Sequence, residues 1–356
     1  MKNTRQINVG KVAIGGGAPV SIQSMTNTKT GDAESTVAQI KELKQAGCQI
    51  VRCAVPDAES AKAISEIKKN IDIPLVADIH YDYRLALLSI EYGADKIRIN
   101  PGNIGSEAAI KEVVDEAKKA GIPIRIGVNG GSLEKDILER HKGVTADALV
   151  ESALRNIKIF EKMNFDNLVV SIKTSDVKTN YEAHKMLSAH TDYPLHIGIT
   201  EAGSGQRALV KSSIGIGSLL LAGIGDTIRV SLTGDPVSEV IAAGDILAAI
   251  GMKKGMINVI SCPTCGRTEV DLEAIASNVN ARLAKLEEAR YKAGKPSITV
   301  AVMGCSVNGP GEAGGADFGV ACGKGKGVIF EKGKIIKTVD ESQIVNELMF
   351  LVSDRV

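Results

Sequence analysis

Short apolar runs alternate with amphipathic stretches from about residue 19 to residue 250, and this alternation constrains the fold more than any other feature of the chain. Apolar runs of strand length separated by segments with helical periodicity are typical of βα units, which build parallel sheets. The runs that predict strands are Val20–Ser24, Gln49–Ala54, Leu75–Ile79, Lys96–Asn100, Ile124–Val128, Leu168–Lys173, Leu195–Thr200 and Thr227–Leu232. The amphipathic stretches between them include Ala33–Ala46, Glu107–Ala120 and Glu239–Ile250.

Eight strands, each followed by a helix, predict an α/β fold in which the sheet closes into a (β/α)8 TIM barrel. An open doubly wound sheet is the alternative, but the even spacing of the eight units favours closure. We expect the first apolar segment, Ile7–Ile14, to form a short hairpin that plugs the base of the barrel.

The pattern changes after Gly251, where Gly251–Gly255 is a predicted linker. The elements expected beyond it are a strand (Met256–Ser261), a long helix (Val270–Tyr291), a strand (Ser297–Met303), a Gly-rich loop (Gly304–Gly327), a hairpin (Gly327–Lys337) and a last helix (Glu341–Val352). The chain therefore divides into a barrel over residues 1–251 and a small α/β domain over residues 256–356.

Composition excludes several classes of function. The chain has 43 basic and 42 acidic residues, so no global charge attracts nucleic acid or a membrane surface. Aromatic residues make up 3%, which leaves few platforms on which bases could stack. The polar N-terminus and the absence of a long uncharged apolar stretch predict a cytoplasmic protein. Six cysteines in such a chain are more typical of thiols or metal ligands than of disulfides.

Polar side chains alternate with apolar ones along several predicted strands, which separates the two faces of each strand. In Lys96–Asn100 the isoleucines pack under the helices, so the other side chains face the barrel axis. The same alternation along the other strands gives the full set of side chains that we expect to face inward. This inward set is Arg52, Asp78, His80, Lys96, Arg98, Asn100, Arg125, Asn129, Ser171, Lys173, His196, Arg229 and Ser231. Most lie near the carboxyl ends of strands, where barrel enzymes place their active sites.

Cations dominate the inward set and predict an anionic ligand. Five of them, Arg52, Arg98, Arg125, Lys173 and Arg229, accompany the acid Asp78. Converging cations are costly unless an anion neutralises them, and guanidinium groups bind phosphate oxygens well. We therefore expect a small diphosphate-like ligand, with the carboxylate of Glu201 at the mouth. The alternative is that these charges pair with helix acids or loop backbone and that His80 and His196 are satisfied core groups.

Three cysteines follow predicted strands in the last third of the chain. Cys262 and Cys265 form a CxxC motif, and Cys305 opens the Gly-rich loop. Three thiolates with a weaker fourth ligand suit an iron–sulfur cubane, and Glu312 on the same loop is a candidate for that ligand. A metal-free thiol pair, or a zinc site completed by Cys322, remains an alternative. We interpret Cys48, Cys53 and Cys322 as buried core residues.

Six segments of the chain carry a family resemblance, and the last two are the most specific. They are Val20–Thr26, Ile99–Asn103, Ile126–Ser132, Gly198–Gly203, the CPTC motif at Cys262–Cys265, and Met303–Ala313. In these segments, which span nearly the whole chain, the sequence resembles the bacterial 4-hydroxy-3-methylbut-2-enyl diphosphate synthase family.

The resemblance implies a TIM barrel followed by an iron–sulfur domain similar to those of sulfite reductases. It implies a 4Fe-4S cluster on Cys262, Cys265 and Cys305, with Glu312 as the fourth ligand in the resting state. It also implies a head-to-tail homodimer, in which the cluster domain of one subunit closes over the barrel mouth of the other. The linker at Gly251–Gly255 is the expected hinge for that closure.

The implied substrate is 2-C-methyl-D-erythritol 2,4-cyclodiphosphate, reduced by two single-electron transfers to the linear allylic diphosphate of isoprenoid biosynthesis. Flavodoxin or ferredoxin would donate the electrons. We expect the diphosphate to be bound by Arg52, Arg98, Asn100, Arg125, Asn129, Lys173 and Ser231. Glu201 is the first candidate for proton transfer, and Asp78 and His80 are the second candidates.

Two other function classes stay open at this point. A zinc-containing phosphate-binding lyase or aldolase on the same barrel would use Lys173 as a Schiff-base lysine. An iron–sulfur carrier without a substrate would leave the inward arginines unexplained. A radical S-adenosylmethionine enzyme is disfavoured because the chain has no CxxxCxxC motif.

Overall fold

The computed structural model describes residues 3–305 and 313–355. The chain divides into two compact units, Met1–Ile250 and Gly251–Val356. Within the described residues, every helix is too short or too polar to cross a membrane.

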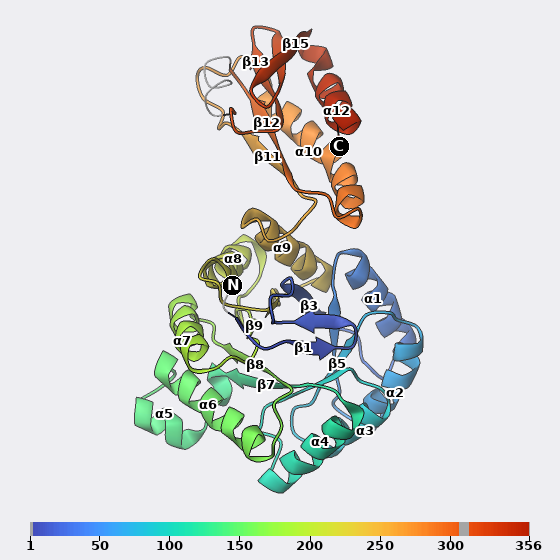
Figure 1. Cartoon of the computed structure of the whole chain (residues 1–356), viewed down its shortest axis with the longest axis vertical. Coiled ribbons are helices and arrows are strands. Elements are labelled where there is room, and N and C mark those ends of the chain that lie inside the picture. Colours follow the sequence, from blue (N-terminus) through green and yellow to red (C-terminus); the bar gives the residue numbers. More distant parts are fainter. Residues whose placement is uncertain (1–2, 306–312, 356) are drawn as a thin grey trace. The chain divides into compact units, whose positions relative to one another are not determined.

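The first unit is a parallel eight-stranded barrel surrounded by helices (Figure 1). The strand order β8-β7-β6-β5-β4-β3-β10-β9 is completed by a parallel bridge between Val170 and Leu195, which links the two ends of the sheet. The predicted TIM barrel is therefore confirmed. The strands are β3 (Ser21–Met25), β4 (Ile50–Ala54), β5 (Leu75–Asp78), β6 (Lys96–Ile99), β7 (Ile124–Asn129), β8 (Leu168–Lys173), β9 (His196–Ile197) and β10 (Thr227–Ile228).

The helices that pack around the barrel begin at well-defined polar residues. Asp32 caps α1, Ser106 caps α4 and Thr145 caps α6, each accepting a hydrogen bond from a backbone N–H of the first turn. The helices are α1 (Ala33–Gln45), α2 (Ala58–Lys69), α3 (Tyr83–Glu91), α4 (Glu107–Ala120), α5 (Lys135–His141), α6 (Ala146–Lys162), α7 (Val177–His190), α8 (Gly205–Leu221) and α9 (Pro236–Ala249).

The predicted hairpin at the barrel base is also present. Strands β1 (Ile7–Val9) and β2 (Val12–Ile14) pair antiparallel. Val9 and Ile14 form a buried apolar cluster with Ile50 of β4 and Val76 of β5. Because Ile50 and Val76 lie toward the start of their strands, the hairpin seals the amino-terminal end of the barrel.

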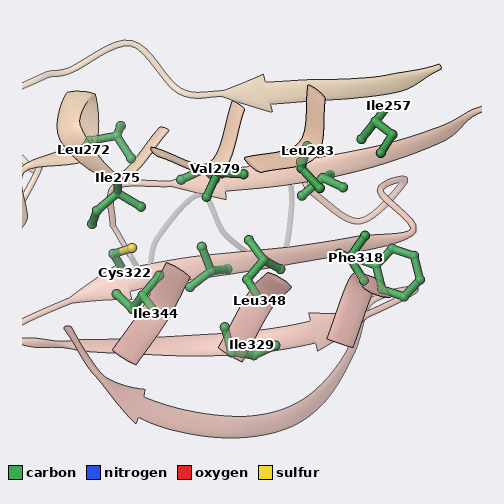
Figure 2. Close-up of a cluster of buried hydrophobic side chains, with 14 residues drawn as sticks. Ile257, Leu272, Ile275, Val279, Leu283, Phe318, Cys322, Ile329, Ile344 and Leu348 are labelled. Carbon is green, nitrogen blue, oxygen red and sulfur yellow. The ribbon is translucent and has the colours of Figure 1, made fainter. Parts of the chain in front are cut away.

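The second unit is a five-stranded sheet packed against two helices. Strands β11 (Ile257–Ser261), β12 (Ile298–Met303) and β13 (Phe318–Gly323) run parallel, and β14 (Lys326–Glu331) and β15 (Lys334–Asp340) continue the sheet antiparallel. Helices α10 (Leu272–Lys292) and α12 (Ile344–Arg355), the latter preceded by a 3-10 turn at Glu341–Gln343, contribute the other side of the core. Figure 2 shows aliphatic side chains of both helices meeting those of the sheet.

One sequence-based expectation for this unit was wrong. The Gly-rich segment Gly304–Gly327 was expected to be a loop, but it contains strand β13. The glycine at position 319 makes room for an aromatic ring, because a Cβ there would lie 2.3 Å from Cζ of Phe330. A glycine in a strand thus marks close packing rather than a turn. Strands β9 and β10 are also shorter than expected.

Candidate active site and cysteine loops

The predicted cations lie inside the barrel: Lys173 ends β8, Arg98 is next to the end of β6, and Arg125 lies near the start of β7, in register with Arg98. Arg98 of β6, Arg125 of β7 and Lys173 of β8 are buried, with 7%, 2% and 8% of their surface exposed. Arg52 of β4 is half-buried. Glycines create the space for two of them. A Cβ at Gly127 would lie 2.7 Å from Nε of Arg98, and a Cβ at Gly198 would lie 2.8 Å from Nζ of Lys173.

Asp78 is the acid around which part of this set is organised. Nη1 of Arg98 donates to its Oδ1 at 3.1 Å, and Nε of Arg52 lies 3.6 Å from its Oδ2. The half-exposed ring of His80 approaches the same Oδ2 at 3.6 Å. Burial would raise the pKa of Asp78, but the charges of Arg52 and Arg98 lower it to about 2. The carboxylate is therefore ionised at any working pH and is a poor proton donor.

Arg125, Lys173 and Lys96 have no carboxylate partner in the part of the chain that the structure describes. Nε and Nη1 of Arg125 and Nζ of Lys96 make no hydrogen bond there. Burial lowers the pKa of Lys173 well below its usual value, and the charges of Arg125 and Arg229 lower it further. Such a set is expected to attract an anion.

Glu239 is a site residue that the sequence analysis missed. It lies in the first turns of α9 and is buried. Its Oε2 lies 3.4 Å from Nη2 of Arg229 and accepts from Oγ of Ser24, and its Oε1 accepts from N–H of Leu232 at 2.9 Å. Asp235 and Pro236 mark the start of α9, and acidic residues are common in the first turn of a helix. The sequence alone therefore did not indicate that Glu239 points into the barrel.

The predicted neutral contacts have different surroundings. Asn100 donates through Nδ2 to Oγ of Ser132 at 3.0 Å and accepts from N–H of Gly102 at 3.1 Å. Asn129, which ends β7, and Ser231, which follows β10, are half-buried. These three residues remain candidate ligand contacts.

Glu201 is exposed on the loop between β9 and α8. Its φ of 52° is in the left-handed region, which a residue other than glycine rarely adopts. Strained backbone of this kind clusters at functional sites. An exposed carboxylate held in this way is free to meet a substrate, so Glu201 remains a candidate for proton transfer.

The cysteine loops meet at the carboxyl ends of two neighbouring strands. Cys262 follows β11 and Cys305 follows shortly after β12, and Ser261 pairs with Val302 across these strands. The N–H of Gly304 donates to Sγ of Cys262 at 3.2 Å. A backbone donor aimed at sulfur is the kind of contact that tunes iron–sulfur clusters. The loop arrangement therefore fits a cluster bridging both strand ends.

The remaining cysteines divide by environment. Cys265 is exposed. A hydrogen bond from the backbone of Arg267, and a second one from the Arg267 side chain, lower the pKa of the Cys265 thiol and favour the thiolate. Cys322 is buried in the core drawn in Figure 2, and burial raises its pKa to about 12. Burial raises the pKa of Cys48 to about 12 and that of Cys53 to about 11. These three buried thiols are unsuited to metal binding.

Across residues 3–305 and 313–355, the structure brings no three His, Cys, Asp or Glu side chains close enough to hold a metal ion. Glu312, the predicted fourth ligand, lies outside the described residues. Three thiols are the donors that iron–sulfur clusters use, and Cys262 and Cys305 follow neighbouring strands. The N–H of Cys265 donates to Oγ1 of Thr268 at 3.1 Å.

Comparisons with known proteins agree with both units. A model of the GcpE TIM-barrel domain matches residues 4–244, and a model of the GcpE protein C-terminal domain matches residues 258–354. The barrel also resembles a solved 7,8-dihydropteroate synthase from Vibrio fischeri, with a TM-score of 0.50, 11% identity, and coverage of 69% of this chain and 98% of that chain. This likeness concerns the fold alone.

The curated relatives match over nearly their full lengths. A protein from Caldanaerobacter subterraneus is 57% identical over 98% of this chain and 96% of its own. One from Clostridium perfringens is 56% identical over 99% and 98%, and one from Geobacillus kaustophilus is 54% identical over 97% and 90%. All three are named 4-hydroxy-3-methylbut-2-en-1-yl diphosphate synthase (flavodoxin). The chain therefore belongs to the GcpE family.

Proposed function

We propose that this chain catalyses the reductive ring opening and dehydration of 2-C-methyl-D-erythritol 2,4-cyclodiphosphate to (E)-4-hydroxy-3-methylbut-2-enyl diphosphate in isoprenoid biosynthesis. The observation that carries this proposal is the 57% identity over 98% of the chain to a relative of that name. The reaction consumes two electrons and two protons and releases one water as a ring C–O bond opens. The same name supports flavodoxin as the electron donor.

The barrel would bind the diphosphate through its buried cations. Arg125 and Lys173 have no carboxylate partner among the described residues, so both side chains are available to phosphate oxygens. Arg52 and Arg98 are held in place by Asp78. This arrangement would hold the leaving phosphate oxygen and stabilise the charge that develops on it.

The second unit would hold the redox group. Cys262, Cys265 and Cys305 would bind a 4Fe-4S cluster, with Glu312 as the exchangeable fourth ligand. A bound cluster supplies the two electrons one at a time. The N–H of Gly304, already directed at Sγ of Cys262, would stabilise negative charge on the sulfur.

Iron and sulfide analysis of anaerobically purified protein tests this assignment. We expect about four irons and four sulfides per chain, a broad visible absorbance, and turnover of the cyclodiphosphate with reduced flavodoxin. The variant C305A should lose all three signals. Colourless protein that binds one zinc per chain after reconstitution would instead support the lyase alternative, which the family membership does not favour.

Glu201 is our candidate for proton transfer at the barrel mouth. The variant E201Q should keep its cluster absorbance and its affinity for the cyclodiphosphate, while turnover falls by about 10²–10⁴-fold because the proton source is lost. The exposed acid Glu182 of α7 gives the matched control E182Q, which should turn over normally. Normal turnover of E201Q would remove Glu201 from the mechanism and leave His80 as the next candidate.

We further propose that two chains form a head-to-tail dimer in the cytoplasm, in which the cluster of one chain serves the barrel of the other. Exposed apolar side chains on α8 and α9 support contact with another chain: Val210, Ile214, Leu221 and Ile241. Mixing the inactive variants R98A and C305A tests this. Activity should reappear in mixed dimers, because one barrel and one cluster then remain intact in the same composite site. Permanent inactivity of the mixture in dimers shown to exchange subunits would place both halves of the site in one chain.

A further inference from the structure

Lys96 lies deeper in the barrel than the proposed diphosphate-binding residues. It occupies β6 two residues before Arg98 and shares its inward face, so it sits about 7 Å nearer the amino-terminal end. Its neighbour in register on β5 is Val76, which packs against the hairpin that seals the barrel base. Lys96 is 0% exposed, and its Nζ makes no hydrogen bond to any part of the chain that the structure describes.

The groups facing Lys96 from the surrounding strands are mostly positive. Arg125 of β7 and Arg52 of β4 act on it directly. His196 of β9 is fully buried, and neither of its ring nitrogens has a hydrogen-bond partner within residues 3–305 and 313–355. Burial lowers the pKa of His196, and the charges of Lys173 of β8 and of Lys96 both lower it further. The acid of this region, Asp78 of β5, already pairs with Arg52 and Arg98. A charged ammonium at this position would therefore lack a counter-ion.

We propose that Lys96 is a neutral amine in the ligand-free enzyme and takes up a proton when the substrate diphosphate binds above it. Lys96 is thus a positioning residue that adjusts the charge beneath the ligand. Burial, together with Arg125 and Arg52, lowers the pKa of Lys96 well below its usual value, which agrees with this geometry. A negative charge about 7 Å away raises the proton affinity of a buried amine roughly fiftyfold at an effective dielectric constant of about 20. The proposal rests on the proposed function for the identity of the ligand.

Proton uptake has a measurable consequence for binding. If a proton enters with the ligand, the Kd of the cyclodiphosphate rises with pH between the pKa values of Lys96 in the free and the bound enzyme, by no more than the roughly fiftyfold gain in proton affinity. The ligand does not contribute to this slope, because each phosphorus of the cyclic diphosphate carries a single, strongly acidic hydroxyl. The slope therefore reports groups of the protein.

The first experiment measures this slope by calorimetry on the oxidised, cluster-loaded enzyme without reductant, so that the ligand is not consumed. The wild type should lose affinity as the pH rises from about 7 to about 9, by up to roughly fiftyfold in total. The variant K96M, which replaces the amine by an apolar chain of similar length, should lose this pH-dependent change in affinity. The exposed Lys62 of α2 provides the control K62M, with the wild-type slope. An unchanged slope in K96M, or loss of the slope in H196Q alone, would overturn the proposal.

A second experiment tests Lys96 without any ligand. An amine that is neutral in the folded chain and charged in the unfolded chain makes unfolding take up a proton, so stability rises with pH up to the ordinary lysine pKa of about 10.4. K96M should therefore have a higher Tm than the wild type near neutrality, and the gap should narrow toward about pH 9. A gap independent of pH would refute the neutral amine. Failure of the cyclodiphosphate to bind wild type and K62M alike would instead count against the proposed function.

Discussion

Nζ of Lys173 packs directly against the backbone of Gly198, where a Cβ would lie 2.8 Å from that nitrogen and 2.4 Å from the carbonyl oxygen of Arg229. The lysine can adjust, but the backbone oxygen cannot. Gly198, which follows β9, therefore leaves room for the backbone of Arg229 and for the side chain of Lys173, a proposed diphosphate-binding residue.

The variant G198A should lose about 1–3 kcal/mol of stability through overpacking and should bind the cyclodiphosphate more weakly. Gly217 of α8 is the control, because a Cβ there meets nothing within 4 Å. G217A should gain about 0.5–1 kcal/mol from its helix propensity. Urea unfolding and calorimetric titration measure both effects. Wild-type affinity in G198A would show that Lys173 does not contact the ligand.

The variant D78N should lose about 3–5 kcal/mol of stability, because it leaves Arg52 and Arg98 without their shared buried counter-ion. The folded pKa of about 2 lies below the usual value of about 3.9, so the stabilisation by Asp78 is complete above about pH 4 and is lost as the pH falls toward 2. The difference between wild type and D78N should stay constant between about pH 5 and about pH 8 and shrink below about pH 4. A difference that varies in the neutral range would contradict this assignment.

The variant E239Q keeps an acceptor for the N–H of Leu232 but removes the negative charge beside Arg229. Loss of this charge-assisted contact should cost about 1–3 kcal/mol of stability. Affinity for the anionic cyclodiphosphate should rise severalfold, because Arg229 is no longer neutralised. Thermal unfolding and calorimetry report the two changes. Unchanged affinity with abolished turnover would instead assign Glu239 a direct part in the chemistry.

The variant C322A should keep the full iron and sulfide content while losing about 1 kcal/mol of stability, because the thiol fills space in the core of the second unit. C262A is the comparison and should lose the cluster absorbance. If C322A also lost iron, the fourth cysteine would be a ligand, and the zinc alternative would regain support.

Alternation along the strands was enough to place most of the barrel's inward residues. The pleat of a strand sends neighbouring side chains to opposite faces, so the pattern Lys96–Ile97–Arg98 is sufficient to direct two cations to the barrel interior. The positions of Cys262 and Cys305 after apolar strands likewise brought both loops to one end of the sheet.

Other features depended on packing that no local pattern encodes. Glu239 has the sequence context of an ordinary acid in a helix's first turns, and only the packing of α9 against β3 turns it toward Arg229 and Ser24. Strand β13 was not predicted, because glycines such as those of this segment are typical of turns. Gly319 instead makes room for the ring of Phe330, which is distant in the sequence.

The sequence by itself determined the eight βα units, the excess of inward cations and the cysteine spacing, because each follows from local periodicity and residue type. The tertiary structure decided which charges are neutralised. Asp78 forms ion pairs with two arginines, whereas Lys96 is buried without a counter-ion among the described residues. The physical reason is that the cost of a buried charge depends on which neighbours closure of the barrel brings within a few ångströms.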